Sequence, residues 1–285
     1  MTEIFIMGAS GNVGLEVARS LQAMNTPFRA GDLDPEKIKQ QLGSAIQTVR
    51  FVLGDQTTYE PAFSGIKKMF LMRPPQISNV KKYIFPTIDA AIQAGVEHFL
   101  FLSLIGIEQN KFVPHYKVEQ YLVKRGIAYT FLRASFFMQN LHTTHRIEIR
   151  DRNEIYIPAG NSKTSFLDTR DIGQVAAVAL TQVGHENKAY DLTGGEALDY
   201  YQVAAQMSQE LGRTIVYRSP GLLSFVRQKV IEGTPLPFAL IMAFLYHNTQ
   251  KGMAATVNQE VERLMGRKPS SLRQYIRDYR EYWQP

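Results

Sequence analysis

The sequence predicts an α/β fold in which a doubly wound parallel sheet carries a smaller, mostly helical C-terminal region. Three observations lead to this prediction. An apolar run at residues 4–7 leads directly into a glycine-rich turn. Short β-rich segments then alternate with helical patterns, as they do in parallel sheets with helices on both faces. Beyond about residue 195 the pattern becomes mostly helical.

The turn after the first strand reads Gly8-Ala9-Ser10-Gly11-Asn12-Val13-Gly14. Three glycines at this spacing allow a tight strand-to-helix turn, let the backbone approach a pyrophosphate, and let the helix pack closely on its strand. The sequence therefore predicts a Rossmann-type dinucleotide site, and the alternative is a turn that serves packing alone. The predicted cofactor-binding residues of this turn are Gly8, Ser10, Gly11, Asn12, Val13 and Gly14.

The remaining strands and helix ends follow from local patterns. We expect strands at residues 3–7, 28–32, 49–53, 69–73, 98–102, 128–132 and 189–193. Asp34 before Pro35 predicts the start of the second helix, and Gly126 predicts the end of a later one. Pro86 predicts a kink in the helix at 79–95, or its start.

The C-terminal half departs from this simple alternation. Residues 151–165 are rich in turn formers and predict an excursion before a helix at 171–182 returns to the sheet. Asp199 and Gln202 have the spacing of a capping box at the next helix. We expect a dinucleotide-binding domain at 1–150, with 166–195 returning to it, and a substrate-binding region at 196–285, with 151–165 contributing.

Asp32 ends the second predicted strand, where an acidic side chain accepts hydrogen bonds from the adenosine ribose. The alternative is an aspartate that serves the turn. Leu33 stands where enzymes that bind a 2′-phosphate usually carry arginine, so the sequence favours NAD(H) over NADP(H). A long side chain from Arg29 is the competing contact for a 2′-phosphate.

Polar residues also follow three further strands at the carboxyl edge, where ligands gather in such sheets. We predict cofactor contacts from Asp55, from Arg73 with Pro74, and from Ser103. The alternatives are an Asx turn at Asp55 and a helix cap at Ser103.

Composition excludes several classes of site. The chain has no cysteine, which excludes disulfides, thiolate metal sites and thiol nucleophiles. The six histidines show no metal-binding spacing, so we predict no metal. The net charge is +6, but acidic residues interleave with the basic ones near the C-terminus, so we expect no nucleic-acid partner.

The location in the cell is predicted from the apolar segments. The most apolar later stretch, 237–246, is far shorter than the roughly 20 residues that span a bilayer. The first strand begins where a signal peptide would lie. We therefore expect a cytoplasmic protein that binds no membrane.

A family resemblance adds to these predictions. Five segments together resemble the NmrA-like family of atypical short-chain dehydrogenases/reductases over nearly the whole chain: 8–14, 113–119, 129–133, 136–140 and 168–172. The resemblance implies that the glycine turn binds pyrophosphate, that strand-end residues hold adenosine, and that the phenylalanine segment lies by the nicotinamide. Phe136 and Phe137 thus become candidate pocket residues, with core packing as the alternative.

The chain departs from the short-chain dehydrogenase pattern at the catalytic motif. Those enzymes typically use Tyr-x-x-x-Lys, and Val113 stands where the tyrosine would fall. His115 is then a candidate proton donor, because its unperturbed pKa is near neutrality, and Lys117 is a candidate to bind ribose or substrate. A surface histidine and a solvated lysine are the alternatives.

These residues predict an NAD(P)H-dependent oxidoreductase that transfers hydride to a quinone or similar conjugated carbonyl compound, with protons from water. Its small-molecule acceptor is expected to be apolar or aromatic, and the apolar segment 236–246 either covers a pocket for it or belongs to the core. Two alternatives stay open. One is a non-catalytic dinucleotide sensor that controls a protein partner, as in regulators of the resembled family. The other is a nucleotide-sugar isomerase or epimerase, whose relatives normally need the missing tyrosine.

Overall fold

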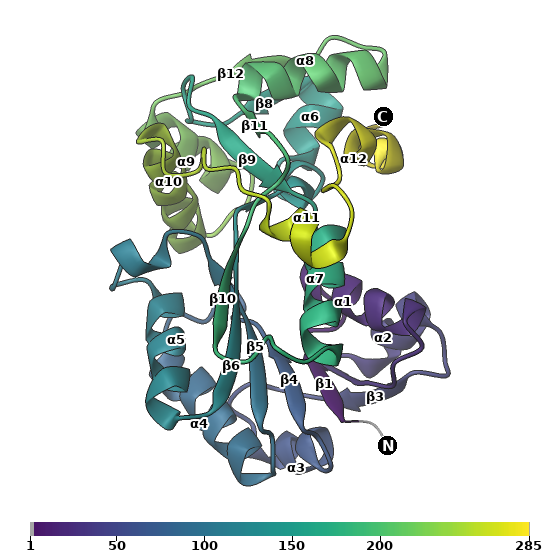
Figure 1. Ribbon diagram of the computed structural model, residues 1–285. Helices are drawn as coiled ribbons and strands as arrows, with labels where there is room; N and C mark the ends of the chain where they lie inside the picture. The colour runs from purple at the N-terminus through teal and green to yellow at the C-terminus, as the bar shows by residue number, and fades with distance from the viewer. Residues whose placement is uncertain (1–2, 285) are drawn as a thin grey trace. The chain divides into compact units, whose positions relative to one another are not determined.

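The computed structural model describes residues 3–284 and confirms the predicted Rossmann-type α/β fold. Its central sheet is parallel and has the strand order β10-β6-β5-β4-β1-β2-β3 (Figure 1). The strand order reverses between β1 and β4, so the topological switch point lies between these two strands. The strands are β1 (Ile4–Met7), β2 (Arg29–Asp32), β3 (Gln47–Arg50), β4 (Lys68–Leu71), β5 (His98–Leu104), β6 (Ala128–Ala134) and β10 (Lys188–Leu192).

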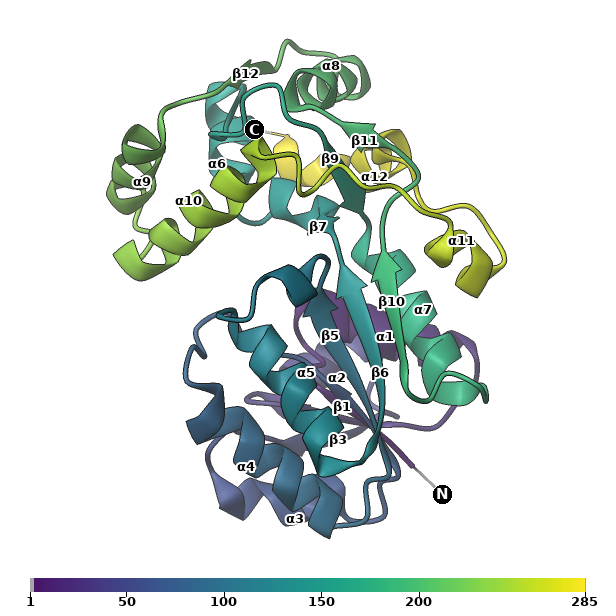
Figure 2. The ribbon, with the colours of Figure 1, turned by 60° about the vertical axis from the view of Figure 1, so that its left-hand side comes forward.

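Helices cover both faces of this sheet (Figures 1 and 2). One face carries α1 (Asn12–Ala23), α2 (Pro35–Leu42) and α7 (Thr169–Thr181), and the other carries α3 (Tyr59–Phe63), α4 (Val80–Gln93) and α5 (Pro114–Arg125). The second face buries an aromatic core in which Phe5, Phe51 and Phe63 make edge and tilted ring contacts. Single turns of 3₁₀ helix lie at Gln56–Thr58 and Ile107–Gln109.

The predicted helix ends agree with the structure at three places. Asp34 accepts hydrogen bonds from the first-turn N–H groups of α2, Gly126 ends α5 in the left-handed conformation, and Asp199 with Gln202 forms the capping box. The alternative that a helix starts at Pro86 is wrong. Helix α4 starts at Val80, because the Asn79 side chain caps its first turn, and it runs through the proline.

The chain divides into two compact units. Unit 1 comprises Met1–Ala134, Thr169–Leu192 and Glu260–Arg267, and unit 2 comprises Ser135–Asp168, Thr193–Gln259 and Lys268–Pro285. The chain therefore first passes from unit 1 to unit 2 after Ala134, and not at residue 150. The physical reason is that β7 (Phe136–Phe137) pairs with β9 (Thr164–Leu167) instead of prolonging the central sheet.

Unit 1 also includes a segment near the C-terminus, Glu260–Arg267, that the sequence pattern did not assign to it. Helix α11 (Glu260–Met265) lies against α7, and Arg267 donates to the buried Asp171 carboxylate at 2.8 Å. An ion pair to a buried carboxylate thus ties this segment to the sheet domain.

Unit 2 contains more β structure than the sequence predicted. The excursion at 151–165 holds β8 (Glu154–Tyr156) and the first residues of β9, which belong to two small sheets of order β12-β8 and β11-β9-β7. Their other strands are β11 (Ala197–Leu198) and β12 (Val216–Arg218). The helices are α6 (Arg146–Arg152), α8 (Tyr200–Leu211), α9 (Leu222–Ile231), α10 (Leu236–Gln250) and α12 (Leu272–Asp278), with 3₁₀ turns at Met138–Leu141 and Arg280–Trp283.

Candidate functional site

The glycine turn joins β1 to α1, and Gly8 and Gly14 each meet a separate steric demand. Gly8 has φ +71°, and a Cβ there would lie 2.7 Å from Met72 Sδ. A Cβ on Gly14 would lie 2.2 Å from the Gly8 carbonyl oxygen, so helix α1 approaches the turn too closely for any side chain. Gly11 is the N-cap residue of α1 and donates its N–H to the same carbonyl at 3.0 Å.

The start of α1 presents backbone donors. The first N–H groups of a helix have no acceptor within that helix, and Gly11 has no side chain to accept them. Val13 packs into the core, so this position offers only its N–H group, whereas Asn12 offers its N–H group and an exposed amide side chain. Together with the helix dipole, this arrangement suits a phosphate.

Asp32 connects the end of β2 to the glycine turn. Its carboxylate accepts from the Ser10 N–H at 2.9 Å and from the Leu33 N–H at 2.7 Å. Asp32 therefore stabilises the turn, as the alternative interpretation predicted. The carboxylate stays half-buried at the edge of the turn, and the Leu33 side chain is 65% exposed.

Arg29 lies at the other end of β2 and has its own acceptors. Its guanidinium Nη1 donates to the carbonyl oxygens of Pro61, Ala62 and Ser64 at 3.1, 2.9 and 2.9 Å. These three bonds hold the side chain at the C-terminal end of α3, away from the carboxyl end of β2.

Arg73 and His115 lie beside each other on the carboxyl side of the sheet. Arg73 follows β4, and its Nη1 donates to the carbonyls of Pro74, Pro75 and Ile77 at 2.9, 3.2 and 2.8 Å. Its Nε lies 3.4 Å from His115 Nε2, in the first turn of α5. His115 is buried and not at the surface, and this burial together with the Arg73 cation lowers its pKa to about 3.

Ser103 belongs to a polar network that the sequence pattern did not indicate. Its Oγ donates to Glu119 Oε1 at 2.6 Å, and Glu119 is bound through both oxygens by Arg133. Arg133 also pairs with Glu108. The hydroxyl of Ser103 thus has a protein acceptor, and it does not form the helix cap that was its alternative role.

Asp55 and Lys117, two other predicted site residues, lie at the surface and show no special environment. Asp55 accepts from the N–H and the hydroxyl of Thr57 at 3.1 and 2.6 Å, which is the Asx turn of the alternative interpretation, and these bonds lower its pKa. Lys117 is exposed on α5.

Phe136 and Phe137 form strand β7 of unit 2 and are half-buried. Phe136 packs against the core of that unit, and its ring centroid is 6.2 Å from that of Tyr246. Its side chain therefore already has the core contacts that were the alternative to a pocket role.

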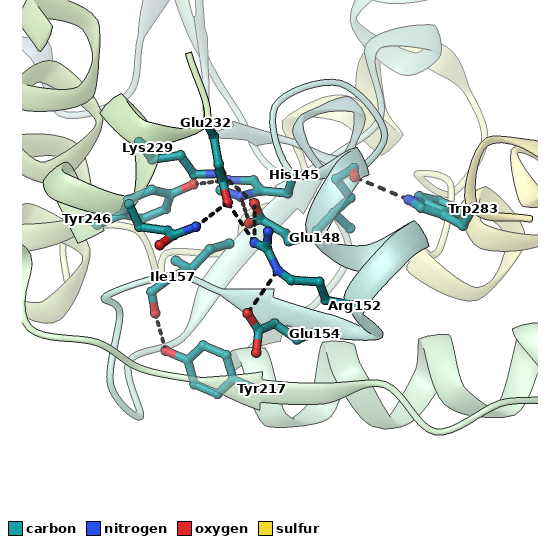
Figure 3. Close-up of polar contacts among 12 residues, drawn as sticks. His145, Glu148, Arg152, Glu154, Ile157, Tyr217, Lys229, Glu232, Tyr246 and Trp283 are labelled. Carbon is teal, nitrogen blue, oxygen red and sulfur yellow. Dashed lines mark hydrogen bonds and ion pairs between the residues drawn. The ribbon is translucent and has the colours of Figure 1, made fainter. Parts of the chain in front are cut away.

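Unit 2 also contains a buried ionic network that sequence reasoning missed (Figure 3). His145 contacts Glu148 through Nδ1 at 2.6 Å and the Tyr246 hydroxyl through Nε2 at 2.7 Å. Glu148 also accepts from Lys229, which contacts Glu232 at 3.1 Å. The network links α6 to α9 and α10 beneath the surface.

Metal clusters and membrane spans are absent from the described residues. Within residues 3–284, no three His, Asp or Glu side chains come together as a metal-binding group. Over the same residues, every helix is too short or too polar to cross a bilayer.

Comparisons with known proteins cover almost the whole chain. Residues 1–283 match the family model described as the NmrA-like family. An NAD(P)H azoreductase of Xenophilus azovorans is 34% identical over 93% of this chain and 93% of its own length.

Two solved structures have the same fold. An NADPH-dependent quinone oxidoreductase from Escherichia coli has a TM-score of 0.81 at 25% identity, covering 96% of this chain and 98% of that one. A triphenylmethane reductase of Citrobacter sp., solved with NADP(H), has a TM-score of 0.83 at 23% identity and covers 97% and 99%.

Proposed function

Because the chain belongs to the NmrA-like family, we propose that it is an NAD(P)H-dependent oxidoreductase that transfers hydride to a quinone or similarly conjugated acceptor. The observation that carries the proposal is the glycine turn, in which the close approach of Gly14 to the Gly8 carbonyl excludes a side chain and brings the start of α1 against the turn. Relatives named as an azoreductase, a quinone oxidoreductase and a triphenylmethane reductase support the class of acceptor.

We assign residues of unit 1 to successive parts of a bound dinucleotide. The N–H groups at the start of α1 would hold the pyrophosphate, and Asp32 would accept from the adenosine ribose while it also holds the turn. Arg73, Pro74 and His115 follow along the same carboxyl edge toward the nicotinamide end. The pocket role of Phe136 and Phe137, which belong to unit 2, stays a prediction. The bound cofactor supplies the hydride.

We further propose that NADH is preferred to NADPH, although one structural relative is named as NADPH-dependent and the other was solved with NADP(H). The exposed Leu33 offers no charge to a 2′-phosphate, and Asp32 repels one. Arg29, the competing cation, is held away from this position by its hydrogen bonds to three backbone carbonyls.

The cytoplasmic location of the protein also stays a prediction.

Leu33→Arg is expected to strengthen NADPH binding by about tenfold or more relative to NADH, since a charge-assisted bond to phosphate contributes about 1.5–3 kcal/mol. Isothermal titration of both cofactors measures this, with Leu33→Gln as a polar control that carries no charge. Tighter binding of NADPH than of NADH by the unmodified protein would contradict the proposed preference.

The proposed hydride transfer needs little acid catalysis from the protein. Val113 replaces the expected tyrosine, Ser103 donates to Glu119, and the low pKa of His115 leaves its ring uncharged near pH 7. An electrophilic acceptor takes hydride without prior protonation, and solvent then supplies the proton. Binding and orientation are therefore the main tasks of this chain.

The acceptor is expected to contact apolar surface. Helix α10 contains no Asp, Glu, Lys or Arg, and it exposes Leu240, Ile241 and Phe244 by 53, 45 and 49%. Such a face suits a flat apolar molecule better than a polar one.

The direct test follows NADH oxidation by its absorbance with panels of quinones, azo dyes and triphenylmethane dyes. We expect acceptor-dependent oxidation with at least one panel. One NADH is consumed for each quinone or triphenylmethane dye reduced, and two for each azo bond fully cleaved, because that cleavage takes four electrons. Stoichiometric cofactor binding without turnover on any acceptor would favour the second candidate, a dinucleotide sensor of the NmrA type. The observation that favours this second candidate is the absence of the catalytic tyrosine, in whose place the chain has Val113.

A further inference from the structure

The contact between Arg73 and His115 constrains the chemistry of the imidazole ring. The guanidinium is fixed by three carbonyls of its own loop, so its Nε–H direction toward His115 Nε2 is set by the backbone. A guanidinium has only donors, and an imidazole nitrogen that receives a donor must carry a lone pair. Nε2 is therefore the unprotonated nitrogen, and the ring proton lies on Nδ1.

The other ring nitrogen is left without a protein partner. Within the described part of the chain, His115 Nδ1 is buried and makes no hydrogen bond. Buried donors are nearly always paired in folded proteins, so an unpaired one calls for an explanation such as a water or a ligand. The low pKa caused by burial and by Arg73 agrees with a neutral ring.

The ring lies on the ligand side of the sheet. Strand β4 is hydrogen-bonded to both β1 and β5, and His115 follows β5 while Arg73 follows β4. Met72, next to Arg73, is the residue that a Cβ on Gly8 would meet. A short chain of contacts thus joins the glycine turn to the imidazole at the switch point.

We propose that Arg73 holds His115 in its neutral Nδ1–H tautomer, and that this N–H donates to an oxygen of the bound dinucleotide or of the electron acceptor. The second half rests on the proposed function, and the first half does not. Arg73 is thereby a positioning residue, and His115 is a hydrogen-bond donor to the ligand that transfers no proton.

The tautomer is tested in cofactor-free protein by long-range ¹H–¹⁵N correlation spectra of ¹⁵N-histidine-labelled samples. His115→Asn identifies the signal among the six histidines. We expect the Nδ1–H pattern in the unmodified protein and in Arg73→Lys, which keeps a donor. We expect loss of that single-tautomer pattern in Arg73→Met. An Nε2–H tautomer or an imidazolium in the unmodified protein near pH 7 overturns the proposal.

The ligand contact is tested with two amide replacements of His115. Asparagine places its NH₂ group near the former Nδ1, whereas glutamine places it near the former Nε2. We expect His115→Asn, which keeps a donor at this place, to retain about tenfold more affinity than His115→Gln, the size of one hydrogen bond. A loss in the Kd for NADH identifies the cofactor as partner, and a loss in KM for a quinone alone identifies the acceptor.

The outcomes separate the two proposals. Equal behaviour of the asparagine and glutamine variants in both measurements overturns the donor role, even when the tautomer is as expected. Failure of the unmodified protein to bind NADH or NADPH overturns the proposed function and, with it, the ligand half of this inference. Thermal melting of each variant verifies that it is folded.

Discussion

Gly14→Ala is expected to abolish dinucleotide binding and to destabilise unit 1 by about 3 kcal/mol, the upper part of the range for overpacked sites. The added Cβ would lie 2.2 Å from the Gly8 carbonyl oxygen and 2.7 Å from the Gly8 carbonyl carbon. Both are backbone atoms, so no side-chain rotation relieves the clash. The start of α1 must move away from the turn, and its N–H groups then lose their common direction.

Isothermal titration with NADH and thermal unfolding followed by circular dichroism measure the two effects. Gly195→Ala is the matched control, because its Cβ would meet its nearest neighbour, Pro269, only at 4.0 Å. Gly11→Ala should be intermediate, with 3.3 Å to the Gly8 oxygen. Normal NADH affinity in a stable Gly14→Ala protein would show that the close approach is not needed for binding.

The features of unit 1 that could be predicted from sequence are those that local physics decides. The glycine turn, the Asp34 cap and the left-handed Gly126 each depend on a few neighbouring residues, and the structure has all three. The alternation of strands and helices also sufficed for the parallel sheet. Strand bounds moved by a few residues, as at β3, because tertiary pairing and not local preference sets where a strand ends.

The features that could not be predicted depend on partners distant in sequence. Nothing near Ser103 indicates that its hydroxyl donates to Glu119, since only the packing of α5 on β5 brings them together. The early crossing into unit 2 depends on the pairing of the two-residue strand β7 with β9, and two residues are too few to show a periodicity.

The same reasoning explains why several candidate side chains already have hydrogen-bond partners within the protein. Asp32, Asp55 and Ser103 were chosen because they follow strands, and all three make hydrogen bonds within the protein. Position at a carboxyl edge therefore does not tell which polar groups remain available to a ligand. His115 differs, because its Nδ1 has no acceptor in the described chain.

Lys229→Met is expected to destabilise unit 2 by about 3–5 kcal/mol, because it leaves Glu148 with a buried negative charge and one partner fewer. The exposed fractions of the two side chains are 2% for Lys229 and 1% for Glu148. Methionine fills a similar volume, so the loss reports the charge and not a cavity. Trp283, the single tryptophan of the chain, is buried in unit 2, and its fluorescence reports unfolding of that unit.

Two variants test whether the ion pair is the cause. Arg227→Met removes an exposed cation from the same helix and should change stability by less than about 0.5 kcal/mol. Glu148→Gln combined with Lys229→Met should recover part of the loss, because no buried charge is then left unpaired. A double variant as unstable as the sum of its parts would show that the two side chains act independently.

The pH dependence of unit 2 gives a last and independent check of the same pair. Burial raises the pKa of Glu148, but His145 and Lys229 outweigh it, so the folded-state pKa lies below the usual value. The stabilisation is therefore present above the unfolded pKa of about 4.3 and is lost as pH falls through the folded-state value. Lys229→Met weakens this downward shift, so we expect the stability gap between the two proteins to be widest near pH 7 and to narrow in acid. A gap that stays constant from neutral pH down to about pH 3, below the unfolded pKa, would assign the loss to packing and not to charge.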